Sequence, residues 1–105
     1  IWMILGVGAG ALLGNNIGAQ LDEKDRLLAG QTIQQTLELG PDNSVGSWQN
    51  PNTGHSGTVV PTQTVVASTG QPCREFITTV TVGGVEQQGY GTACRQADGS
   101  WKIVQ

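Results

Sequence analysis

The distribution of apolar and polar residues divides this chain into three stretches. Residues 1–21 are uncharged and mostly apolar, residues 22–39 mix charges with apolar residues at roughly helical spacing, and residues 40–105 alternate β-prone runs with turn signals. An apolar run of this length predicts a membrane helix, and the mixed run predicts an amphipathic helix. We therefore expect a membrane helix over 1–21, a connecting helix over 22–40 and a β domain over 41–105.

Glycines recur at four-residue steps in the apolar stretch. The stripe consists of Gly6, Gly10, Gly14 and Gly18. In water, each glycine inside a helix costs about 1 kcal/mol relative to alanine, so this stripe opposes a soluble helix. In lipid the backbone stays helical, and glycines at this spacing let two helices approach closely. The stripe predicts a glycine-zipper transmembrane helix that packs against other helices.

A second small face lies on another side of the predicted helix. It contains Gly8, Ala11 and Ala19. Two small faces favour two neighbours, one a hairpin partner and the other another subunit. Asn15 and Asn16 either hydrogen-bond between helices or mark the end of the embedded part, and both alternatives stay open.

Two other interpretations of the apolar stretch fit less well. A secretory signal peptide would have a basic region before the run and a clear cleavage site after it, and neither is evident here. A buried core helix would require a larger domain around it. We therefore favour the membrane helix.

The charged stretch has recognisable start and stop signals. Asp22 is a suitable N-cap with Asp25 three residues later, a weaker form of the capping box. Gly40 and Pro41 end the predicted helix. The charge run from Asp22 to Arg26 is interpreted as the solvated start of the helix, and secondarily as the place where the chain leaves the bilayer.

The remaining sequence predicts a small antiparallel sheet. Turn signals separate β-prone runs, and we expect strands near 45–49, 57–66, 73–82, 85–96 and 101–105. Pro61 interrupts the second run, which predicts that this strand is at an edge or is bent.

The two cysteines can be placed by counting outward from the Gly-Gly turn at 83–84. A two-residue hairpin turn pairs Val82 with Val85, and equal steps outward place Cys73 opposite Cys94 in a close, non-hydrogen-bonded pair. We therefore predict a Cys73–Cys94 disulfide, which is typical of a periplasm or cell exterior.

The same register suggests which face forms the core. Ile77 falls opposite Tyr90 on the cysteine face. A two-residue turn at 98–99 would add Trp101 and Ile103 of the last strand to the same face. We expect a core made of Trp48, Ile77, Tyr90, the disulfide, Trp101 and Ile103. Phe76 would cover Gly91 on the opposite face.

Charge argues against a nucleic-acid partner. The formal net charge is −3, and the five basic residues are scattered and form no patch. Nucleic-acid binding needs a concentration of positive charge, so we expect no such partner.

The residues that could carry chemistry are few. His55 is the single histidine, and a catalytic base needs a partner nucleophile or carboxylate, which adjacent Ser56 is poorly placed to supply. One histidine and two cysteines are a poor zinc ligand set. Arg74 and Arg95 could bind an anion, but surface ion pairs with carboxylates are favoured. We expect no enzyme, no catalytic residues, no metal, no cofactor and no small-molecule substrate.

Several segments carry a family resemblance. They are GALLGNNIGAQLDEKDR (10–26), WQNPNTGHSGTVVPT (48–62), CREF (73–76) and GYGTACRQADGSWKIV (89–104). Together they resemble the seventeen-kilodalton surface antigen family of Gram-negative outer-membrane lipoproteins. The resemblance implies a lipid-anchored protein with a glycine-zipper helical hairpin and a small β domain. The family's lipidated cysteine and first glycine segment lie outside these residues, so lipidation is implied by the resemblance alone.

These observations define an α+β fold class: a glycine-zipper membrane helix and a short polar helix, followed by a small antiparallel sheet with one disulfide. The main hypothesis is a non-enzymatic, structural protein of the bacterial outer membrane, with its β domain in the periplasm or at the cell surface. It would self-associate, or pack on another outer-membrane protein, through Gly6, Gly8, Gly10, Gly14 and Gly18. The alternative is a membrane-anchored binding module whose β domain recognises a protein or peptidoglycan.

Overall fold

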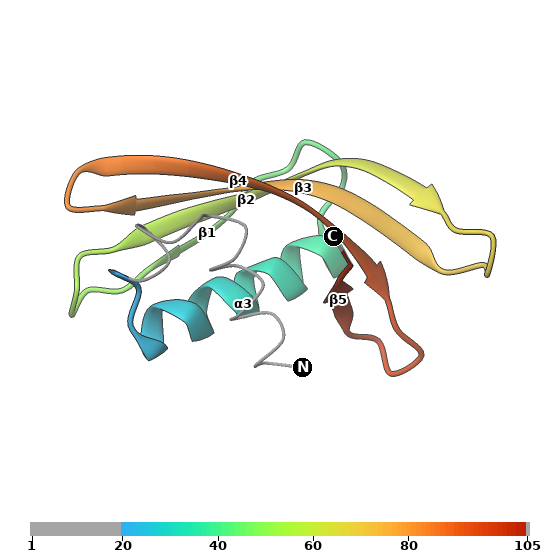
Figure 1. Ribbon diagram of the computed structural model, residues 1–105, viewed down its shortest axis with the longest axis horizontal. Coiled ribbons are helices and arrows are strands. Elements are labelled where there is room, and N and C mark those ends of the chain that lie inside the picture. The colour runs from blue at the N-terminus through green and yellow to red at the C-terminus, as the bar shows by residue number, and fades with distance from the viewer. Residues whose placement is uncertain (1–19, 105) are drawn as a thin grey trace.

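The computed structural model describes residues 20–104, in which one helix lies beneath a curled antiparallel sheet (Figure 1). The helix is α3 (Glu23–Leu39). The strands are β1 (Gly46–Gln49), β2 (Ser56–Val66), β3 (Pro72–Val82), β4 (Val85–Arg95) and β5 (Trp101–Ile103). Each strand pairs with its neighbours in sequence, in the order β1-β2-β3-β4-β5. The described residues confirm an α+β fold with an antiparallel sheet.

The predicted transmembrane helix over 1–21 falls almost entirely outside the described residues. The five glycines assigned to helix packing, Gly6, Gly8, Gly10, Gly14 and Gly18, lie outside them as well. Within residues 20–104, no helix combines the length and the apolar character needed to cross a membrane. The membrane helix and its packing stripe therefore stay predictions.

The start of α3 has the predicted capping box. The side chain of Asp22 accepts a hydrogen bond from the backbone nitrogen of Asp25 at 2.7 Å. Asp25 Oδ2 in turn accepts from the backbone nitrogen of Asp22 at 3.1 Å. Two backbone donors that a helix start leaves unpaired are thereby satisfied.

The β3–β4 hairpin has the predicted register. Gly83 and Gly84 have φ angles of 59° and 81°, which a two-residue turn of this kind requires and glycine supplies without strain. The turn pairs Val82 with Val85 and places Cys73 opposite Cys94. These cysteines form the predicted disulfide, with their Cα atoms 4.0 Å apart.

The core forms on the face of the sheet that the sequence did not favour. We call the side against α3 the helix face and the other side the outer face. The helix face carries Phe76, which is 1% exposed, and joins it to a cluster of Ile33, Leu37, Val59, Ala93 and Trp101. The expectation that Ile77 and Tyr90 lie in the core was wrong, because both belong to the outer face and Tyr90 is 62% exposed.

The β4–β5 turn explains why Trp101 still reaches the core. A hydrogen bond from Gln96 N to Ser100 O, 2.7 Å long, closes this turn. The loop between these two residues therefore contains three residues and not two, and its last residue, Gly99, has a φ of 89°. Trp101 is consequently paired with Arg95. A shift of one residue moves every side chain of a strand to the other face, so Trp101 and Ile103 join Phe76 and not the cysteines.

Pro61 marks the bend predicted in the second strand. The register of β2 against β3 shifts between Pro61 and Gln63. On its other side β2 pairs with β1 only from Ser56 to Val59, so the second half of the strand lies at an edge of the sheet. A proline without a backbone donor is tolerated at such a position.

Phe76→Ala should remove the largest fully buried side chain and cost about 3–5 kcal/mol of unfolding free energy. Ile77→Ala, one position along on the outer face, should cost much less. Guanidinium unfolding followed by tryptophan fluorescence would compare the two variants. Equal losses would contradict the assignment of the two faces.

Candidate functional site

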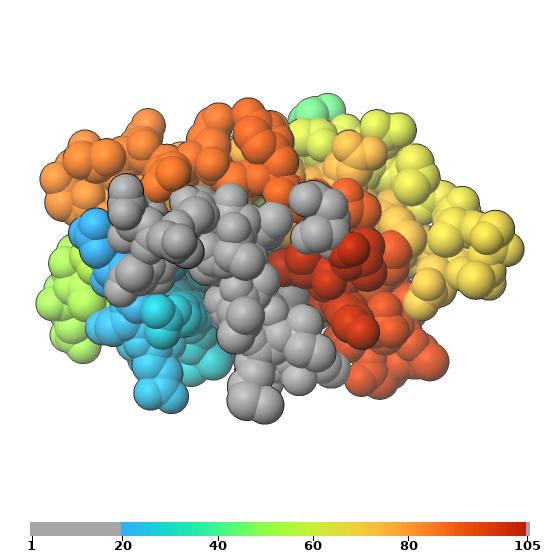
Figure 2. Space-filling view, in the orientation of Figure 1, coloured from blue at the N-terminus to red at the C-terminus, as the bar shows by residue number. Residues whose placement is uncertain are grey.

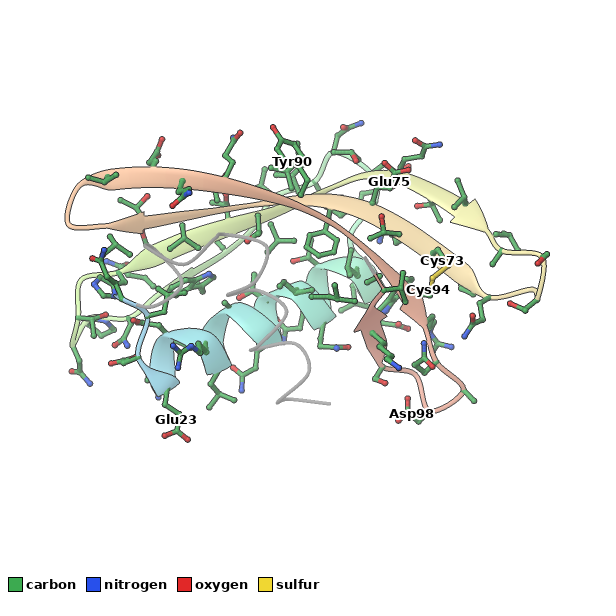
Figure 3. All side chains as sticks on the ribbon, viewed as in Figure 1. Glu23, Cys73, Glu75, Tyr90, Cys94 and Asp98 are labelled. Carbon is green, nitrogen blue, oxygen red and sulfur yellow. A yellow bond between two sulfur atoms is a disulfide. The ribbon has the colours of Figure 1, made fainter. Side chains whose placement is uncertain are left out.

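The disulfide is the one predicted site that lies within the described residues. Cys73 and Cys94 are 5% and 9% exposed and join β3 to β4 on the outer face (Figure 3). The bond lies far along the hairpin from the Gly-Gly turn, so it holds the open end of that hairpin together.

A buried carboxylate is the main polar feature that the sequence analysis missed. Asp25 was expected in the solvated start of the helix, but it is 0% exposed. Figure 3 shows Glu23, in the same helical turn, pointing away from the sheet. The interpretation of the charge run as fully solvated was therefore wrong for Asp25.

Three side chains from the loop between β1 and β2 converge on this carboxylate. Asp25 Oδ1 accepts hydrogen bonds from Asn50 Nδ2 at 2.8 Å and Thr53 Oγ1 at 2.9 Å. Its Oδ2 lies 2.6 Å from His55 Nδ1. We call these four residues the Asp25 cluster. Figure 2 shows the β1–β2 loop lying against the start of α3, where the cluster forms.

The loop is shaped to present these side chains. Asn50 Oδ1 accepts from the backbone of Asn52 at 3.1 Å, and the backbone of Asn50 bonds to both Gly54 and His55. Gly54 has a φ of 76°, a conformation that favours glycine. The closed loop therefore fixes Thr53 and His55 toward the helix.

The hydrogen bonds decide the charge of Asp25. Burial acts to raise the pKa of this carboxyl, but bonds from His55, the Asp22 backbone, Asn50 and Thr53 together lower the pKa below its ordinary value of 3.8. A buried carboxylate surrounded by donors stays ionised at neutral pH. The helix N-terminus adds a further favourable field.

The contact between His55 and Asp25 resembles the pair that orients the imidazole in serine hydrolases. In this cluster the single hydroxyl, that of Thr53, donates to Asp25 itself. Within the cluster no hydroxyl or thiol is left to face the imidazole as a nucleophile. The geometry therefore supports a polar clamp between α3 and the β1–β2 loop.

Arg74 forms a second polar anchor at the other end of α3. Its guanidinium donates to the carbonyl of Leu37 at 2.6 Å, to Asp42 Oδ1 at 2.9 Å and to Thr64 Oγ1 at 3.0 Å. Hydrogen bonds from Arg74 and then from Thr64 lower the pKa of Asp42. The expected ion pair is confirmed, but Arg74 is 6% exposed, so the expectation of a surface position was wrong.

Arg95 forms the predicted surface ion pair. Its Nε lies 3.0 Å from Glu38 Oε1, and both side chains are 41% exposed. Trp101 Nε1 also donates to this carboxylate at 3.0 Å. Hydrogen bonds from Arg95 and then from Trp101 lower the pKa of Glu38. The last turns of α3 are thereby joined to both β4 and β5.

Residues 20–104, which we call the head, form a small α+β unit. Polar anchors tie its helix at both ends to a disulfide-linked sheet. A family profile described as the 17 kDa outer membrane surface antigen matches residues 35–102. The chain belongs to this family, which confirms the resemblance seen in its sequence.

Three relatives are each named a 17 kDa surface antigen. The protein of Rickettsia bellii (strain RML369-C) is 53% identical over 102 residues, which cover 93% of this chain and 64% of the relative. That of Rickettsia japonica (strain ATCC VR-1363 / YH) is 52% identical over 86 residues, or 82% of this chain and 54% of the relative. That of Rickettsia prowazekii (strain Madrid E) is 50% identical over 83 residues, which cover 79% of this chain and 52% of the relative.

The chain thus spans between about half and two thirds of the length of these relatives. No solved structure matches it.

Replacing Asp25 with asparagine should destabilise the head by about 3 kcal/mol at neutral pH, because the amide leaves buried donors without an acceptor. The folded-state pKa of Asp25 lies below its unfolded value. Its contribution is therefore complete above the unfolded pKa and is lost as the pH falls through the folded pKa. Urea unfolding at neutral pH and in steps below about pH 4 should show a smaller acid-dependent loss in Asp25→Asn than in wild type.

Glu23→Gln is the matched control, because it removes an exposed carboxylate from the same turn. This variant should change the unfolding free energy by less than about 0.5 kcal/mol. If Asp25→Asn had the same unfolding free energy as the wild type at neutral pH, the cluster would not clamp the helix.

Proposed function

We propose that this protein is a non-enzymatic surface antigen of the bacterial outer membrane. The observation that carries the proposal is the match of most of the chain to a family of outer membrane surface antigens. The disulfide supports it, because such bonds persist in oxidising compartments outside the cytoplasm. Residues 1–21 would hold the protein in the membrane, and the described head would be displayed on them.

The proposed role is structural. The stripe of Gly6, Gly10, Gly14 and Gly18, with Gly8 on a second small face, would pack against a second copy or another outer-membrane protein. The head supports such a role because buried polar anchors hold its helix at both ends, Asp25 at the start and Arg74 at the finish. A head tied in this way is presented as a rigid unit.

The alternative role is that of a membrane-anchored binding module. The observation that favours it is a hollow on the outer face of the sheet, lined by residues of β1, β2 and β3. The two roles are compatible, since one concerns residues 1–21 and the other concerns the head.

Wild-type protein in mild detergent should associate, and Gly10→Leu and Gly14→Leu should shift it toward monomer, because a leucine at the stripe keeps two helices apart. Native mass spectrometry would measure the distribution. Leu13→Met, in the same stretch but outside the stripe, should leave it unchanged. A monomer both before and after the glycine substitutions would overturn the proposed self-association.

In cells, the protein should sediment with the outer membrane and its cysteines should be oxidised. After acid quenching and denaturation, a maleimide polymer should add mass only if a reductant is supplied first. Cys73→Ser is the control, because it leaves the Cys94 thiol free to react. Free thiols in the wild-type protein would contradict an oxidising location.

A further inference from the structure

One end of the outer face is hollowed. The hollow has a volume of about 530 Å³, within the range of about 300–1,000 Å³ that is usual for small-molecule sites. Its lining is rich in hydroxyl side chains from β1, β2 and β3, namely Ser47, Ser56, Thr58, Thr79 and Thr81. A surface of this composition favours a polar ligand over an apolar one.

The sheet register places these hydroxyls in ordered rows. Ser47 pairs with Thr58, and Thr58 pairs with Thr79, so three hydroxyls follow one another across three strands. Ser56 pairs with Thr81 in the adjacent row of the same face. Neighbouring strands lie about 4.8 Å apart, which makes the rows a rigid grid of hydroxyl groups.

The hydroxyls of the hollow are available to a ligand. On the helix face, Thr78 Oγ1 donates to the carbonyl of Thr58 at 3.2 Å. By contrast, the side-chain hydroxyls of Thr58, Thr79 and Thr81 make no hydrogen bond to another residue of the described chain. A hydroxyl both donates and accepts, so this grid complements a ligand whose own groups do both.

The charge of the hollow excludes two common ligand classes. Among the described residues, Glu86 is the one charged residue that lines it, and no lysine, arginine or histidine does. A phosphate or carboxylate ligand would meet the negative Glu86 without a positive partner. Neutral polyhydroxylated ligands fit the lining better, and the amide of Gln49 adds a further donor and acceptor.

Tyr90 provides an aromatic surface beside the grid. It lies on the same face, one row from the pair formed by Thr79 and Gln88. Figure 3 shows it standing away from α3, and it is 62% exposed. Its hydroxyl donates to Gln88 Oε1 at 3.4 Å. A tyrosine ring joins an apolar body to a polar tip, and a sugar ring has the complementary combination of C–H face and hydroxyl rim.

We propose that the outer face binds a neutral oligosaccharide. The hydroxyls of Thr58, Thr79 and Thr81 bond to sugar hydroxyls, and the ring of Tyr90 packs against a sugar face. This inference deepens the alternative role and rests on it, and it does not depend on the glycine stripe. The same chemistry occurs in cell-wall glycans and in neutral glycans of other cell surfaces.

The test is an NMR titration of the isotope-labelled chain in phosphocholine micelles, which carry no sugar headgroup. Chitotetraose represents wall-type acetamido sugars, and lacto-N-tetraose represents neutral galactose-containing glycans. At least one of them should shift the backbone amide signals of Thr58, Thr79, Thr81 and Gln88. The one that binds more tightly identifies the source.

Thr79→Val keeps the β-branched shape and removes one hydroxyl, so it should weaken binding about fivefold, as expected for one hydrogen bond. Tyr90→Ala should weaken it as well, while Thr92→Val, on the outer face outside the hollow, should bind like wild type. The absence of shifts at millimolar sugar would overturn the proposal. Shifts that survive equally in Thr79→Val would overturn it too. The structural role is tested separately, by the oligomer distribution in native mass spectrometry, and a negative sugar titration would not change that distribution. Failure of this site is therefore distinguishable from failure of the structural role.

Discussion

The positive φ angles of Gly83 and Gly84 close the β3–β4 hairpin in one register, and the two faces of the sheet follow from it. Because side chains alternate along a strand, that register places Phe76 and Ala93 on one side and the cysteines and Tyr90 on the other. The helix then covers one side, and no other described element covers the opposite side. Core, disulfide and hollow are therefore consequences of the same pairing.

Buried charges fix the position of the helix on this sheet. The negative Asp25 lies at the N-terminus of α3, and the positive Arg74 lies at its C-terminus. Each has the sign that the helix dipole favours at that end. Both are also bonded to loops or strands distant in sequence, so the helix cannot slide along the sheet without leaving a buried charge unpaired.

Local signals allowed much of this fold to be predicted. The Gly-Gly turn has few alternatives, so the β3–β4 hairpin and its disulfide followed from the sequence. The capping box followed from the spacing of Asp22 and Asp25. The core face did not, because β3 has apolar residues on both sides, with Ile77 on one and Phe76 and Val80 on the other. The turn after Gln96 could contain two or three residues, and that difference decided the side taken by Trp101.

The Asp25 cluster could not be predicted because its members come from the helix start and from a loop that tertiary packing brings together. Asp25 lies 30 residues before His55 in the sequence, so it is not among the sequence neighbours of the histidine. The predicted packing glycines lie outside the described residues, so the sequence remains the basis for them.

The outer face has a consequence for immune recognition of a displayed head. Its rows draw side chains from β1, β2, β3 and β4, so residues adjacent in space are distant in sequence. An antibody directed at this face binds a discontinuous epitope, which exists only while the strands of the sheet are paired. The hairpin turns, by contrast, present continuous peptide epitopes, which survive unfolding and reduction of the disulfide.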